Sequence, residues 1–74
     1  MSTPKPNNLR LILARNVRHG RRDRGWSQEQ LAERAGLSSV YISQIESSLK
    51  AASIDVIESL AQAFASPAPE LLRD

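Results

Sequence analysis

The stretch from Gln28 to Ile45, QEQLAERAGLSSVYISQI, decides how this chain folds. Ala32 has almost no side chain, and Gly36 can take a positive φ without steric cost. Ile42 and Ile45 lie three residues apart and put an apolar pair on one helical face. Small, glycyl and branched residues therefore fall where two crossing helices must touch. The stretch predicts two short helices joined by a glycine turn.

The segment before this stretch predicts a longer helix that begins near Leu9 and ends at Gly25. Its apolar residues recur at helical spacing over about four turns, at Leu9, Ile12, Leu13 and Val17. Gly20 lies inside this helix, where glycine costs about 1 kcal/mol relative to alanine, so a neighbouring element is expected to approach closely there. Ser27 and Gln30 then form a capping box for the next helix.

The second half of the chain predicts three more helices. Ser38 caps the first of them, and Ser53 begins the second. After Ser66, a last helical turn or two carries Leu71 and Leu72. The apolar stripe of the Ser53 helix contains Ile54, Ile57, Leu60, Ala61 and Phe64. With no strand pattern, the fold class is all-α: a compact bundle of five short helices, with a helix-turn-helix at helices 2 and 3.

Length and composition limit the organisation of the chain. Its 74 residues make one domain, since two cores would each be too small. Residues 1–8 hold two Pro and two Asn without apolar periodicity and are predicted to be a flexible arm, which leaves 9–74 as a single folded domain. No apolar run approaches the ~20 residues of a membrane span, and no signal-peptide core is found near Met1. A cytoplasmic protein without membrane contact is expected.

The composition also argues against enzymatic and metal-dependent functions. The chain has no cysteine, and His19 is its single histidine, so neither a metal nor another cofactor is expected. No acid, base and nucleophile converge, and a bundle this small offers little room for a substrate pocket. We therefore expect a protein that is not an enzyme.

Charge is distributed unevenly along the chain. Up to Gly25 there are seven basic residues and one acidic residue, a balance of +6, whereas from Trp26 onward three basic and seven acidic residues give −4. Clustered cations near the first helix favour an anionic partner, and the helix-turn-helix layout makes double-stranded DNA the first to consider. A solvated basic face remains the alternative, since Arg is a good helix former.

From Arg21 to Phe64 the chain resembles the phage repressor and Cro-like helix-turn-helix family, also called the XRE family. The residues that carry the resemblance are Gly25-Trp26-Ser27-Gln28, Leu31-Ala32, Ala35-Gly36-Leu37, Ile42-Ser43-Gln44-Ile45-Glu46, Leu60-Ala61 and Phe64. In size it is similar to stand-alone members such as restriction-modification controller proteins and small repressors. Gly20 departs from the family pattern, which has a larger apolar residue there. Ser48 and Ala52 depart from it too, where the family often has Gly and Pro.

The resemblance implies a role for individual residues. The third helix, about residues 38–47, enters the major groove while the second crosses the DNA backbone. Gln28 and Lys50 match positions that contact phosphate, and Arg21 and Glu46 match an internal ion pair that sets the orientation of the helices. The positions that match base-facing residues are Ser38, Ser39, Val40 and Gln44. Gln44 suits adenine, a serine hydroxyl suits either base type, and Val40 suits a thymine methyl.

Other contacts follow from residue type. Ser43 is assigned to the DNA backbone, and Tyr41 is expected to pack its ring on the core, with a phosphate contact of its hydroxyl as the alternative. Trp26 is expected to close the first two helices rather than to stack on nucleic acid. The third helix carries no Arg or Lys, which argues against strong guanine recognition and favours DNA shape, water and phosphate contacts.

We predict a sequence-specific DNA-binding transcription regulator that binds a palindromic operator as a homodimer. Its dimer interface is predicted at Phe64, Leu71 and Leu72, because little else remains to cover these apolar groups. The alternative is a protein-interaction module, such as an antitoxin or a bridging factor, with a protein partner on the same bundle. The acidic second half and the uncharged third helix favour that alternative.

Overall fold

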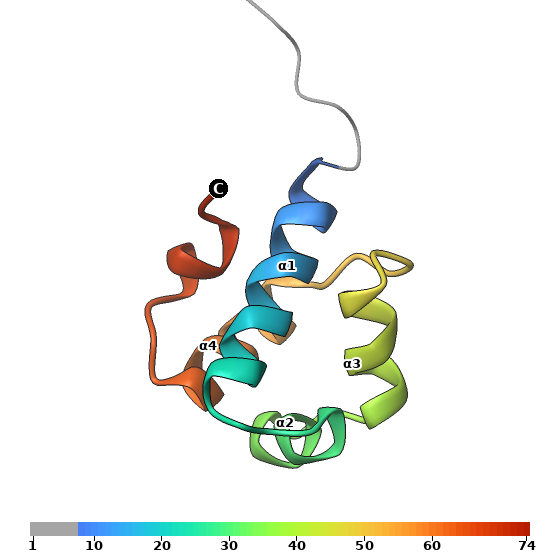
Figure 1. Ribbon diagram of the computed structural model, residues 1–74. Coiled ribbons are helices and arrows are strands. Elements are labelled where there is room, and N and C mark those ends of the chain that lie inside the picture. Colours follow the sequence, from blue (N-terminus) through green and yellow to red (C-terminus); the bar gives the residue numbers. More distant parts are fainter. Residues whose placement is uncertain (1–7) are drawn as a thin grey trace, which may run out of the picture.

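A computed structural model describes residues 8–74 and shows an all-helical bundle (Figure 1). Its elements are α1 Asn8–Asp23, α2 Gln28–Ala35, α3 Ser39–Glu46, α4 Ile54–Phe64 and the 3₁₀-helix η1 Ala68–Leu72. The predicted all-α class is confirmed. Where the sequence predicts a fifth short helix, the described residues form a 3₁₀-helix rather than an α-helix. Residues 1–7 of the predicted arm lie outside the described part.

Capping residues define where α2 begins and how it passes into α3. The Ser27 hydroxyl accepts a hydrogen bond from the backbone N–H of Gln30 (3.0 Å), and the Gln30 side chain accepts one from the Ser27 N–H (2.7 Å), which confirms the capping box. Gly36 ends α2 at φ 70° and ψ 33°, a left-handed conformation that glycine adopts without strain. Ser38 caps α3 by accepting from the Tyr41 N–H at 3.0 Å. Only three residues therefore separate α2 from α3.

The core forms where the four α-helices meet. Val17 from α1, Leu31 from α2, Ile42 and Ile45 from α3 and Leu60 from α4 are all fully buried. Complete burial of an aliphatic side chain contributes about 1.5 to 3 kcal/mol. Because each helix supplies at least one of these side chains, α2 and α3 are held as a pair against α1 and α4 (Figure 1).

Gly20 allows α1 to pack closely against the end of α4. A Cβ atom at this position would lie only 3.1 Å from Cζ of Phe64 and 3.2 Å from both of its Cε atoms. The close approach predicted from Gly20 is thus confirmed. It also accounts for the glycine at a position where the resembling family usually has a larger apolar residue. The side chain of Phe64 occupies that volume instead.

Ser48 adopts a left-handed backbone conformation just after α3. Its φ is 61°, and the Leu49 N–H donates to the Gln44 carbonyl at 2.9 Å, the hydrogen bond that closes a Schellman-type helix end. A left-handed conformation costs a non-glycine residue roughly 1 to 2 kcal/mol. The frequent glycine of the resembling family therefore corresponds to a conformational requirement that serine meets here with strain.

Replacing Ser48 with glycine should stabilise the protein by about 0.5 to 1 kcal/mol. The substitution removes the left-handed strain, while the greater freedom of glycine in the unfolded chain offsets part of that gain. Urea unfolding of Ser48→Gly measures the change, and Ser47→Gly is the neighbouring control, since Ser47 has φ −91°. Destabilisation by Ser48→Gly would contradict the proposed strain.

In the described part of the chain, no helix combines the length and the apolar character that crossing a membrane requires.

Candidate nucleic-acid interface

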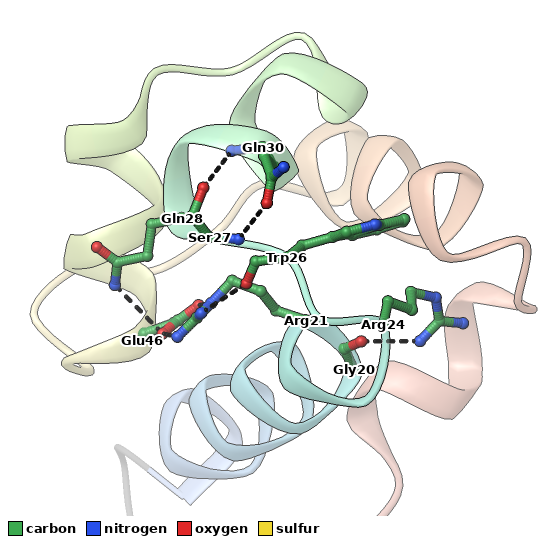
Figure 2. Close-up of polar contacts among 8 residues, drawn as sticks. All are labelled: Gly20, Arg21, Arg24, Trp26, Ser27, Gln28, Gln30 and Glu46. Carbon is green, nitrogen blue, oxygen red and sulfur yellow. Dashed lines mark hydrogen bonds and ion pairs between the residues drawn. The ribbon is translucent and has the colours of Figure 1, made fainter.

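A buried ion pair connects α1 to the C-terminal end of α3. Nε of Arg21 donates to Oε2 of Glu46 at 2.7 Å, and Nη2 of Arg21 donates to Oε1 at 3.0 Å. The third nitrogen, Nη1, donates to the Trp26 carbonyl at 2.9 Å. The two side chains are only 13% and 5% exposed. The structure therefore brings together the two residues that the sequence assigned to an internal pair, and the bidentate geometry sets the angle of α3 (Figure 2).

The hydrogen bonds of this pair favour the charged form of Arg21. The hydrogen bonds to Glu46 raise the pKa of Arg21 above its ordinary value, and the Coulomb attraction of the carboxylate acts in the same direction, against the cost of burial. Arg21 therefore stays protonated, so the position of α3 does not depend on ionisation of the guanidinium.

Gln28 extends the same network into the first turn of α2. Nε2 of Gln28 donates to Oε1 of Glu46 at 3.3 Å, so this carboxylate receives donors from both α1 and α2 (Figure 2). An amide nitrogen carries two hydrogens, which leaves one donor of the half-buried Gln28 for another acceptor. Gln28, the predicted phosphate contact, is thus oriented by Glu46.

One face of α3 is turned away from the core. Its buried residues are Ile42, Ile45 and Glu46, while Val40 has 65% of its surface exposed. We call the opposite, solvent-accessible side the recognition face; its residues are Ser39, Val40, Ser43, Gln44 and Ser47. Four of these five residues belong to the predicted DNA-contacting set. The recognition face carries no charged side chain.

Ser38 has a structural role at the start of α3. Its hydroxyl oxygen accepts the helix-capping hydrogen bond from the Tyr41 N–H. A hydroxyl group has one hydrogen to donate as well as lone pairs, so the capping role leaves the O–H of this exposed residue available to an acceptor. The predicted base contact of Ser38 is therefore compatible with its capping role, with the hydroxyl hydrogen as donor.

Tyr41 and Lys50 lie together beside the recognition face. The Tyr41 ring is half-buried and packs against the core, and Nζ of Lys50 lies 5.1 Å from its centroid, within cation–π range. Lys50 itself is exposed in the segment between α3 and α4. The two predicted phosphate contacts are therefore brought together by the structure.

Two of the three predicted dimer residues are buried within the chain itself. Phe64 is 3% exposed and Leu71 is 5% exposed, whereas Leu72 keeps 36% of its surface accessible. The Phe64 ring stacks on Trp26, with centroids 6.0 Å apart and planes 10° apart. The expectation that a second copy must cover Phe64 and Leu71 is wrong, because α1, Trp26 and the bundle core already do so.

Residues 17–71 match the sequence profile of HTH_3, described as helix-turn-helix. The chain belongs to this helix-turn-helix family. A hypothetical transcription factor of Neisseria meningitidis serogroup B is 39% identical over 69 residues, which are 93% of this chain and 65% of that protein. Control protein C.SmaI of Serratia marcescens is 39% identical over 64 residues, 86% of this chain and 76% of C.SmaI. The chain thus spans just under two thirds of the Neisseria relative.

Solved structures of related proteins have the same fold. The hypothetical transcription factor NHTF from Neisseria superposes with a TM-score of 0.87 and 37% identity, covering 99% of this chain and 84% of that structure. The restriction-modification controller protein C.AhdI from Aeromonas hydrophila has a TM-score of 0.81 and 31% identity, covering 84% of this chain and 94% of its own. The resemblance to restriction-modification controller proteins is confirmed.

In this helix-turn-helix protein, two arginines have structural contacts that no sequence signal revealed. Arg24 donates to the Gly20 carbonyl at 2.9 Å and to the Phe64 carbonyl at 2.6 Å, and it also lies over the Phe64 ring. Arg34 lies 4.4 Å from the centroid of the Trp26 ring. In the sequence, Arg24 is distinguished only as one of the seven basic residues of the first half. Its partner Phe64 is 40 residues away, so no local pattern reports the contact.

Proposed function

We propose that this protein is a transcription regulator that binds a palindromic DNA operator as a homodimer. In this proposal α3, with its flanking residues 38–47, enters the major groove, and α2 crosses the backbone as the first helix of the helix-turn-helix. Two recognition helices lie about 34 Å apart, one turn of DNA, so that each contacts half of the palindrome. The family match and the named transcription factor and controller relatives support this function.

The Arg21–Glu46 ion pair holds α3 in a fixed orientation, and this observation carries the proposal. Glu46 is buried at the C-terminal end of α3 and is held by donors from α1 and α2. A helix that contacts base edges needs its side chains held in place before binding, since ordering them afterwards weakens affinity. This network fixes the orientation of the helix without using any residue of the recognition face.

The recognition face supplies both base and backbone contacts in this proposal. Gln44 pairs with adenine, Val40 packs on a thymine methyl, and Ser39 and Ser38 donate to base acceptors. The phosphate contacts come from the surrounding residues Gln28, Ser43, Lys50 and Tyr41. With no cation among the base contacts, sequence preference depends on DNA shape and bridging water as well as on direct hydrogen bonds.

Because Phe64 and Leu71 are buried, the proposed dimer interface is formed instead by an exposed apolar groove between α4 and η1. Ile54 has 77% of its surface exposed and, together with Ile57, faces the 3₁₀-helix across the groove. We call these apolar lining residues the self-association face: Ile54, Ile57, Ala68, Pro69 and Leu72. An isologous dimer presents the same patch twice, so exposed side chains of this kind can cover each other.

The charges around this face support a two-fold arrangement. Glu58 also lines the groove, and Arg10 lines an adjoining hollow that shares Ile57 and Leu72 with it. In the proposed dimer, a two-fold axis through the shared residues pairs the Arg10 of each copy with the Glu58 of the other. Such a surface is complementary to itself in charge as well as in apolar character.

Reversing either of these charges should weaken self-association about tenfold. Arg10→Glu or Glu58→Arg replaces two attractive pairs with two repulsive ones, at roughly 0.2 to 1 kcal/mol for each exposed pair. The double variant Arg10→Glu/Glu58→Arg should restore the dimer. Sedimentation equilibrium measures the dissociation constant, and Arg22→Glu on the same helix is the control. A double variant weaker than both single variants would contradict the two-fold contact.

Gln44 and Gln28 should differ in how their loss affects DNA binding. Gln44→Ala removes a base contact and should cost about 1 to 3 kcal/mol on the preferred operator while relaxing the preference at one position. Gln28→Ala removes a phosphate contact and should weaken all duplexes nearly equally. Binding titrations on specific and random duplexes measure both. Equal losses on the two duplexes for Gln44→Ala would contradict its role.

Selection of bound duplexes from a random pool tests the proposed function most directly. The expected result is an enriched inverted repeat whose half-sites are about 10 base pairs apart, bound more weakly as salt rises. The alternative is a protein-interaction module, favoured by the uncharged recognition face and the acidic second half. If every duplex binds only at micromolar concentration and without dependence on salt, DNA binding is excluded and the alternative is supported.

A further inference from the structure

Asn16 holds the C-terminal 3₁₀-helix against α1. Nδ2 of Asn16 lies 2.8 Å from the Leu71 carbonyl, 2.8 Å from the Arg73 carbonyl and 3.5 Å from the Glu70 carbonyl. Carbonyl groups only accept hydrogen bonds, so their convergence places the amide nitrogen of Asn16, and not its oxygen, at this point. One half-buried side chain in the middle of α1 thus engages the end of a segment 55 residues away.

Among the described residues, the other polar contacts that hold η1 are exposed or absent. Pro67 precedes it and provides no capping hydrogen bond from its side chain, so the segment begins without a polar anchor. Leu71 is its buried apolar anchor, at 5% exposure. Arg15 adds an exposed hydrogen bond to the Arg73 carbonyl at 3.4 Å and an ion pair with Asp74 at 3.3 Å, and exposed contacts of this kind contribute little. Asn16 is therefore the main polar contact that fixes the end of η1.

The position of η1 decides whether the self-association face exists. Ala68, Pro69 and Leu72 are residues of η1, and they form one side of the groove whose other side is Ile54 and Ile57 of α4. Leu72 also contributes to the adjoining hollow beside Arg10. If η1 shifts on α1, these three side chains leave their places opposite α4. The self-association face is then incomplete although α4 is unchanged.

We propose that Asn16 is a positioning residue for self-association, which acts by holding η1 in the place that completes the self-association face. This inference rests on the proposed homodimer. Asn16 contacts neither the second copy nor DNA in this arrangement; it acts through the carbonyls of Leu71 and Arg73. Its loss raises the dissociation constant of the dimer and leaves the bundle of α1 to α4 folded.

The test compares Asn16→Asp with Arg22→Gln in the full chain. Aspartate keeps the size of asparagine but places acceptor oxygens against the acceptor carbonyls of η1. Both substitutions lower the net charge by one on the same helix, and Arg22 is exposed, so Arg22→Gln controls for charge. Sedimentation equilibrium should show a dimer dissociation constant at least tenfold higher for Asn16→Asp and within twofold of wild type for Arg22→Gln.

A second measurement separates positioning from loss of fold. Trp26 is the single tryptophan and packs on Phe64 and Arg34, so its fluorescence reports the integrity of the bundle rather than of η1. Native Trp26 fluorescence with weakened self-association supports the proposal. If Asn16→Asp fails to fold, Asn16→Ala removes the donors without adding repulsion and should show the same weakened dimer.

Two outcomes would overturn the inference, and they differ in what they say of the homodimer. In the first outcome, the wild type dimerises and a folded Asn16→Asp or Asn16→Ala variant has a dissociation constant within twofold of the wild-type value. This result contradicts only the role of Asn16. A wild-type chain that remains monomeric up to millimolar concentration contradicts the homodimer, and the role of Asn16 with it.

Discussion

Replacing Glu46 with alanine should lower the free energy of unfolding by about 3 to 5 kcal/mol, the usual loss when one partner of a buried ion pair is removed. The side chain of Arg21 is only 13% exposed, and its guanidinium would lose both of its carboxylate contacts. Gln28 would lose its acceptor as well. Small domains have about 5 to 15 kcal/mol of total stability, so the loss is a large fraction of it.

Thermal unfolding followed by circular dichroism measures the effect of Glu46→Ala, which should lower the Tm by more than about 10 °C. Glu46→Gln is the matched control, because it keeps the volume and one acceptor oxygen and should lose less. The double variant Arg21→Leu/Glu46→Leu should recover part of the loss by removing the uncompensated charge. A Tm unchanged in Glu46→Ala would show that the pair contributes nothing to the fold.

The stabilising effect of this pair through Arg21 should not vary with pH in the usual range. The hydrogen bonds with Glu46 raise the folded-state pKa of Arg21 above its value in the unfolded chain, which is already far above neutral pH. A raised pKa contributes stability that is complete below the unfolded value and is lost only as pH rises through the folded one. Changes in stability at neutral or acidic pH must therefore arise from other groups.

Replacing Phe64 with alanine should destabilise the single protomer by about 3 to 5 kcal/mol, the range for deletion of a buried aromatic ring. The ring fills the space above Gly20, stacks on Trp26 and lies 4.7 Å from the Arg24 guanidinium. Removing it empties this volume and leaves Trp26 without its stacking partner. The expected loss therefore arises within one chain and does not depend on a second copy.

Urea unfolding of Phe64→Ala at two protein concentrations tests this assignment, because a loss within one chain has the same size at both. Leu72→Ala is the contrasting variant: at 36% exposure it should cost little stability and should weaken self-association instead. If Phe64→Ala keeps wild-type stability at low protein concentration but weakens the dimer, Phe64 is a residue of the dimer interface after all.

Local sequence signals predicted most of the helix boundaries. Each of these boundaries depends on residues within one helical turn, so the local sequence is enough to predict it. They are the capping box of Ser27 and Gln30, the Ser38 cap and the left-handed Gly36. Gly20 predicted a close approach because glycine is unfavourable inside a helix unless something needs the space. The identity of the approaching group, Phe64, had no such local signal.

The candidate site divides in the same way. The pairing of Arg21 with Glu46 and the outward position of Val40 agree with what the family resemblance implied. The hydrogen bond from Gln28 to Glu46 and the contact of Lys50 with the Tyr41 ring emerged only from the structure. Each joins side chains on different elements, whose relative placement depends on the packing of the whole bundle.

The sequence by itself determined the all-α class, the helix starts and the helix-turn-helix family, because caps, helical periodicity and the Gly36 turn are short-range properties. Only the tertiary structure decided which apolar residues are left uncovered. Phe64 and Leu71 lie inside the bundle, while Ile54 and Leu72 remain at its surface. All four are apolar and fall in segments predicted to be helical, so composition does not separate them. Burial depends on which distant element packs against each face. Here α1 packs against the C-terminal segments through Gly20, which contacts Phe64, and through Asn16, which binds the Leu71 carbonyl.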